Sequence, residues 1–105
     1  MSDTHKTGLK YFVIIAEHKM KKKLLTLLGD HGAHGIDTVY AHGSMSPGAI
    51  AAAFGFEAEQ NKVIITCLVR GDEAVTLMDT LYHDYRFSKP NTGIAFTVPV
   101  EGLAF

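Results

Sequence analysis

Tryptophan is absent from this 105-residue chain, and it contains one cysteine and three prolines. The single cysteine, Cys67, excludes a disulfide within the chain, and its apolar surroundings predict a buried structural thiol. The net charge of -1 lacks the basic excess that is typical of nucleic-acid-binding proteins. The apolar run 11–16 is far too short for a membrane span or a signal-peptide core. We therefore expect a soluble protein of a reducing, cytoplasmic compartment.

The composition is that of an ordinary globular protein, because 47% of the residues are apolar and 20% are charged. The length suits one domain with one core, so we expect residues 1–105 to form a single domain. Four lysines, Lys19, Lys21, Lys22 and Lys23, lie close together at the predicted start of a helix. Such a run is more typical of a solvated helix face than of an anion site.

Strand and helix patterns alternate along the chain. Strands are predicted at 9–16, 36–41, 62–69 and 93–100, a first helix at 19–28, and a second helix from an N-cap at Asp72 to a break at Pro90. The second helix has its apolar positions at Val75, Met78, Leu81, Tyr82 and Tyr85. Pro99 cannot donate to a strand ladder, so it belongs at an edge or strand end.

The order of these elements predicts an α+β, ferredoxin-like βαββαβ fold, with a four-stranded antiparallel sheet and both helices on one face. The predicted strands are apolar at nearly every position, although an antiparallel sheet with one wet face is expected to alternate. The second face therefore needs a cover, most simply copies of the same chain. We expect a homo-oligomer.

A long segment, residues 43–61, interrupts this alternation and is called the arm below. It is rich in Gly, Ala and Ser, yet it carries Met45, Ile50, Phe54 and Phe56. Loops of this length in small domains are usually functional or disordered. These four apolar residues could dock into a groove of a partner protein, or they could pack on the oligomer as an ordered cover.

Neither a catalytic nor a metal site is predicted. The acidic residues are scattered, and no Gly-x-Ser-x-Gly sequence is present, so we expect no enzymatic activity. Three histidines, His31, His34 and His42, lie close together in sequence, and histidine is a common ligand of transition metals. No cysteine or carboxylate spacing completes a known metal site, so exposed turn histidines are the favoured interpretation.

Three stretches resemble the PII-type nitrogen-regulatory signalling proteins, and more closely their shorter PII-like relatives. Gly35-Ile-Asp-Thr-Val-Tyr-Ala-His-Gly43 is similar to the family strand that enters the T-loop, and Lys62-Val-Ile-Ile to the strand that leaves it. Asn91-Thr-Gly-Ile-Ala-Phe-Thr-Val-Pro-Val100 is similar to the family's B-loop and last strand, which usually read Gly-Asp-Gly-Lys-Ile-Phe-Val-x-Pro-Val.

The resemblance implies a homotrimer whose three intersubunit clefts bind an adenine nucleotide, and whose T-loop, here the arm, engages a membrane transporter or a metabolic enzyme. By position, the nucleotide site consists of Gly43, Lys62, Asn91, Thr92 and Gly93. From local sequence alone, residues 90–93 are better explained as a tight turn between a helix and a strand, and only the resemblance makes the phosphate-binding interpretation comparable.

The chain departs from the family pattern at the phosphate-binding positions. The B-loop lysine is replaced by Ile94, the first glycine by Asn91 and the aspartate by Thr92, and no arginine follows Val100. ADP or AMP is therefore a more suitable effector than ATP. Three alternatives remain open: a family member that has lost nucleotide binding, a metal-binding trimer similar to the divalent-cation tolerance proteins, and a purely structural interaction module.

Overall fold

The computed structural model describes residues 8–41, 61–90 and 92–102. The elements are β1 (Leu9–Glu17), the 3₁₀ helix η1 (His18–Met20), α2 (Lys21–Asp30), β2 (His34–Ala41), β3 (Lys62–Arg70), α4 (Gly71–His83) and β4 (Gly93–Pro99). The predicted order is confirmed, with strand ends displaced by one or two residues. Within these described ranges, no helix is long and apolar enough to cross a membrane.

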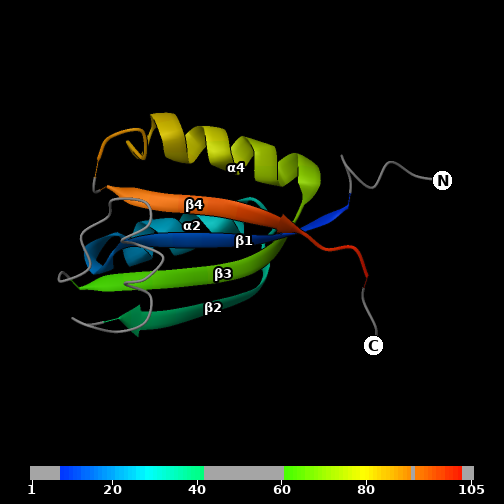
Figure 1. Cartoon of the computed structure of the whole chain (residues 1–105), viewed down its shortest axis with the longest axis horizontal. Helices are drawn as coiled ribbons and strands as arrows, with labels where there is room; N and C mark the ends of the chain where they lie inside the picture. The colour runs from blue at the N-terminus through cyan, green and yellow to red at the C-terminus, as the bar shows by residue number, and fades with distance from the viewer. Residues whose placement is uncertain (1–7, 42–60, 91, 103–105) are drawn as a thin grey trace.

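The four strands form one antiparallel sheet in the order β2-β3-β1-β4 (Figure 1). The central strand β1 pairs with β3 from Leu9 opposite Arg70 to Glu17 opposite Lys62. On its other side β1 pairs with β4. Pro99 is the last residue of β4, which is an edge strand of the described sheet, as its missing N–H predicts. The ferredoxin-like arrangement is therefore confirmed.

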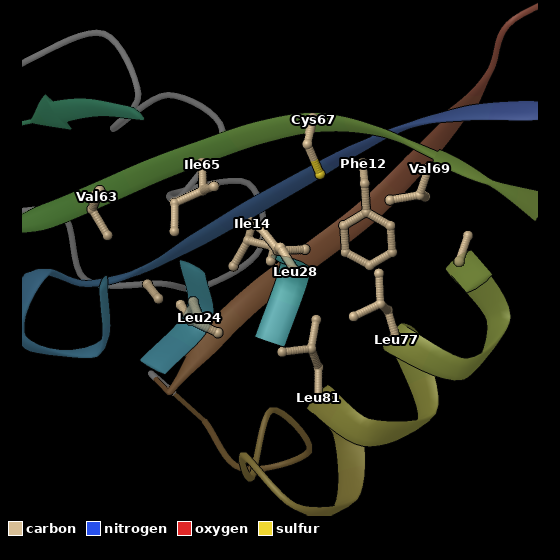
Figure 2. Close-up of a cluster of buried hydrophobic side chains, with 12 residues drawn as sticks. Phe12, Ile14, Leu24, Leu28, Val63, Ile65, Cys67, Val69, Leu77 and Leu81 are labelled. Carbon is tan, nitrogen blue, oxygen red and sulfur yellow. The ribbon is translucent and has the colours of Figure 1, made fainter. Parts of the chain in front are cut away.

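The main core lies between one face of the sheet and the two helices (Figure 2). Alternate residues of β1 and β3 point toward α2 and α4, because successive strand side chains face opposite ways. The buried set comprises Phe12, Ile14, Ala16, Val63, Ile65, Cys67 and Val69 from the strands and Leu24, Leu28, Ala74, Leu77 and Leu81 from the helices. Cys67 is buried as predicted, and this burial raises the pKa of its thiol to about 11. The thiol is therefore protonated and unreactive at neutral pH.

The opposite face of the sheet, called the distal face below, is also apolar. Val13 and Ile15 are buried there, and Ile64, Ile94 and Phe96 pack against them. The register extends this apolar surface to three further residues that remain exposed, namely Tyr11, Val39 and Val98. The sheet thus carries apolar side chains on both faces, as the lack of alternation in the sequence indicates.

Helix α4 begins earlier than predicted, and Asp72 is not its N-cap. The N-cap residue is Arg70, and Asp72 lies inside the first turn, where its Oδ1 accepts a hydrogen bond from the Glu73 N–H at 2.8 Å. The Arg70 guanidinium donates to both carboxylate oxygens of Asp72, at 3.2 and 2.9 Å. These hydrogen bonds hold the pKa of Asp72 below its usual value. A carboxylate in the first turn also suits the helix dipole.

The prediction for the second helix is confirmed in part, because Leu81 is buried and Met78 and Tyr85 pack against the core. It is wrong at two positions. Ala74, Leu77 and Leu81 are buried, whereas Val75 and Tyr82 are 71% and 55% exposed. Two apolar stripes of similar helical spacing, 74–77–81 and 75–78–82, lie side by side on this helix. Periodicity alone could not choose between them. The structure buries the stripe that starts with the small Ala74, and it places Tyr85 beyond the end of the helix.

Truncating one residue from each stripe would test this assignment. We expect Leu77→Ala to lower the free energy of unfolding by about 2–5 kcal/mol, because it leaves a cavity in the main core. Val75→Ala should change it by no more than about 0.5 kcal/mol, because Val75 is exposed. Urea denaturation followed by circular dichroism gives both values, and equal losses would show that the buried stripe is assigned wrongly.

Candidate functional site

One end of the sheet gathers residues from segments that are far apart in the sequence. β1 and β2 end there, and β3 and β4 begin there (Figure 1). Lys62 lies opposite Glu17 on one side of β1, and Gly93 lies opposite Ala16 on the other. Three of the residues that the resemblance indicates, Lys62, Gly93 and the adjacent Thr92, thus lie at the same end of the sheet, on either side of β1.

The other residues of the predicted site lie outside the described part of the chain. These are Gly43 and Asn91 of the predicted nucleotide site and Met45, Ile50, Phe54 and Phe56 of the predicted partner-binding arm.

Lys62 is a buried charged residue, with only 4% of its surface exposed. Its neighbours Val63 and Ile65 belong to the core beneath the helices, so Lys62 itself lies on the distal face. Glu17 occupies the opposite position on β1, and Ala41, the last residue of β2, pairs with Lys62 on the other side. A buried ammonium requires polar or anionic partners. Lys62 thus places a positive charge beside the two ends of the arm.

Gly93 is required by close packing in this fold. A Cβ on Gly93 would lie 2.4–2.7 Å from three ring atoms of Phe87, a separation at which atoms overlap. The Phe87 N–H also donates to the Leu81 carbonyl at 3.0 Å. The missing side chain of Gly93 therefore leaves room for the Phe87 ring. This role could not be predicted from the sequence, because an irregular turn with no periodic pattern joins the two residues.

Ile94 has a packing role on the distal face. It lies opposite Ile15 in the register and packs against the cluster of Val13 and Ile15. The position where the resemblance expects a phosphate-binding lysine is therefore an apolar contact.

Two hollows flank this end of the sheet. The larger, about 510 Å³, is lined by Met20, Lys23, Asp84, Tyr85, Arg86 and Thr92. The second, about 430 Å³, is lined by Glu17, His18, Lys19 and Asn61. Residues 84–86, between α4 and β4, were missed by the sequence analysis, because a turn gives no periodic pattern to indicate a lining role.

Aromatic and cationic contacts tie the end of β2 to η1 and α2. The ring of Tyr40 lies 4.7 Å from the ring of His18, measured between centroids. Lys21 donates to the Tyr40 hydroxyl, and its Nζ lies 5.0 Å from the centroid of that ring. These contacts fix β2 at the point where the arm begins.

The histidines do not gather in the described part of the chain. His31 follows α2, and its Nδ1 lies 2.7 Å from Glu73 Oε1 on α4, so it links the two helices. His34 is the exposed first residue of β2, and His42 lies outside the described residues. Among the residues that the structure describes, no three His, Cys, Asp or Glu side chains are grouped as metal ligands would be.

Several solved structures share this fold. A PII-like signalling protein from Thermus thermophilus is 25% identical, with 88% of this chain and 85% of that chain covered and a TM-score of 0.64. CPII from Thiomonas intermedia, a nitrogen regulatory PII-like protein, is 19% identical, with 88% of both chains covered and a TM-score of 0.66. The GlnK–ATP complex of B. subtilis is 16% identical, with 89% and 84% covered and a TM-score of 0.59.

CPII has also been solved with ADP, AMP and acetate and with ADP and bicarbonate. No protein-family model and no curated protein matches the sequence, so the likeness rests on these structures.

The close packing of the Phe87 ring against Gly93 can be tested by adding a methyl group at position 93. We expect Gly93→Ala to lower the free energy of unfolding by about 1–3 kcal/mol, because the new methyl group overpacks the ring. Gly29→Ala is the matched control, because a Cβ there meets nothing within 4 Å, and it should cause no loss. Adding Phe87→Leu to Gly93→Ala should recover part of the loss in urea denaturation. If the two alanine variants were equally stable, the close-packing role of Gly93 would be wrong.

Proposed function

We propose that this chain is a PII-like, cytoplasmic signalling protein that binds ADP or AMP and regulates a target protein, because PII-like proteins of known structure share its fold. The observation that carries the proposal is the gathering of Lys62, Thr92 and Gly93 around the end of β1. An ammonium, a hydroxyl and the backbone of a turn are suitable donors for a phosphate. The proposed role is regulatory rather than catalytic.

The preference for fewer phosphates follows from the charges at this end of the sheet. Ile94 contributes no positive charge, so Lys62 is the cation that remains at the positions of the family pattern. Each added phosphate brings negative charge that needs a cation or hydrogen-bond donors. CPII, whose fold is similar, has been solved with ADP and AMP, which supports this choice.

A homotrimer is the proposed assembly, with the nucleotide in clefts between subunits. Support comes from the distal face, where Tyr11, Val39 and Val98 remain exposed beside the buried Val13 and Ile15. An apolar surface of this kind is characteristic of an interface. Association through the distal face would bring Lys62 of each subunit close to a neighbouring copy.

The arm, residues 43–61, is the segment that we propose contacts the target protein in response to the ligand. Ala41 and Lys62 pair with each other at its two ends, so a ligand that contacts Lys62 acts directly at the base of the arm. Such a ligand would stabilise the arm conformation that it binds best. Met45, Ile50, Phe54 and Phe56 are the proposed contacts to a transporter or metabolic enzyme, on the grounds of their composition.

Calorimetric titration with AMP, ADP and ATP tests the effector. We expect ADP or AMP to bind at least as tightly as ATP. Lys62→Ala should weaken ADP binding about 10- to 100-fold, the effect of losing one charge-assisted hydrogen bond. Lys62→Met removes the charge but keeps the apolar part of the side chain, so it separates lost binding from misfolding. Lys10→Ala, at the far end of β1, is the control and should leave ADP binding unchanged. ATP tenfold tighter than ADP, or unchanged affinity in both Lys62 variants, would refute the proposed site.

The assembly can be tested by light scattering, which should give three times the chain mass of 11.4 kDa. Val98→Glu should shift the mass toward the monomer, because it places a charge on the distal face. Val75→Glu, on the exposed side of α4, should leave the trimer intact. A stable monomer at micromolar concentration of the unmodified chain would exclude both the trimer and its clefts.

A further inference from the structure

The outer side of α4, which faces away from the sheet, carries apolar side chains. Val75 and Tyr82 are exposed there, and Met78 lies between them on the same stripe. A helix that meets only its own sheet is expected to be polar on its outer side. Tyrosine and methionine are instead enriched at protein interfaces. The outer side of α4 therefore has the composition of a contact surface.

The two helices carry opposite charges on their outer sides. On α4, the side chain of Asp79 is 74% exposed, and its Oδ1 lies 3.1 Å from His83 Nδ1, one turn further on. On α2, Lys22 and Lys23 are exposed in the first turn. Among the ion pairs of the described residues, none uses Lys22 or Lys23. The start of α2 is therefore complementary in charge to the outer side of α4.

A hollow of about 370 Å³ lies along the outer side of α2. Its lining consists of Lys22, Lys23, Thr26, Leu27, Asp30 and Tyr85. Lys22, Thr26 and Asp30 are exposed and four residues apart, so they lie on one side of the helix. Leu27 and Tyr85 are partly buried and form an apolar wall. The hollow therefore offers an apolar contact to an aromatic ring and, at the start of α2, two cations to a carboxylate.

The helices α2 and α4 lie antiparallel (Figure 1). His31 Nδ1, at the end of α2, lies 2.7 Å from Glu73 Oε1 in the first turn of α4. At the other end, Lys23 Nζ in the first turn of α2 lies 5.8 Å from the centroid of the Tyr85 ring, just beyond α4. The start of α2 and the end of α4 are therefore at the same level along the two helices.

We propose that the outer side of the two helices is a docking surface for a second copy of this chain. A two-fold axis that runs between the helices, parallel to them, places α4 of each copy on α2 of the other. Tyr82 then enters the hollow along α2, and Asp79 faces Lys22. In a two-fold contact each of these pairs forms twice. The distal face lies on the other side of the sheet, so this contact goes beyond the proposed trimer and can form together with it.

The test is sedimentation equilibrium of the full chain over a range of concentrations, in which the mass should rise above that of the species present at low concentration. Asp79→Lys and Lys22→Asp should each weaken this association about tenfold, because like charges then face each other. An equal mixture of the two variants should associate as the unmodified chain does, because each supplies the charge that the other has lost. Glu101→Lys, with the same change in charge beyond β4, is the control and should have no effect.

Misfolding is an unsuitable explanation for a weaker association of these variants. A lysine near the end of α4 and an aspartate in the first turn of α2 both suit the helix dipoles, so both variants should keep their melting temperature. A mass that does not depend on concentration, or a mixture that associates as weakly as its two components, would overturn the docking surface. Absence of the trimer or of nucleotide binding would refute the proposed function alone, because this contact uses neither the distal face nor Lys62.

Discussion

The pairing of β1 with β3 on one side and β4 on the other positions the rest of this molecule. It sends Phe12, Ile14 and Ala16 beneath the helices and Val13 and Ile15 to the distal face. The same register brings the starts of β3 and β4 to the end of β1. A slip of β3 by one residue would reverse its faces and place the charge of Lys62 in the main core. Core and candidate site therefore depend on one set of strand contacts.

Packing and ligand binding are compatible roles for the turn before β4. Gly93 resembles a ligand-loop glycine in sequence, and in the structure it seats the Phe87 ring. That contact anchors the turn that carries Arg86 and leads to Thr92. A rigid turn reduces the conformational entropy that a ligand would have to remove on binding. The packing role therefore supports a binding role for the same segment.

Positive charge reaches this end of the sheet from elements other than the start of β4. Ile94 packs on the distal face, while Lys62 begins β3, Lys23 lies on α2 and Arg86 lies in the turn after α4. Lys62 lies on the distal face, whereas Lys23 is on a helix that covers the other face. A ligand that contacts all of these cations would have to extend around the end of the sheet.

The order of strands and helices, the burial of Cys67 and the position of Pro99 at a strand end could all be predicted from the sequence, because each depends on a local pattern or on the chemistry of one residue. The buried face of α4 could not, since stripes 74–77–81 and 75–78–82 have the same spacing and only contact with the sheet selects one. The gathering of Lys62 and Thr92 was implied only by resemblance. Only the tertiary structure revealed the packing of Phe87 against Gly93 and the hollow beside Arg86. Each joins residues from different elements, and no periodic pattern in the sequence relates those residues.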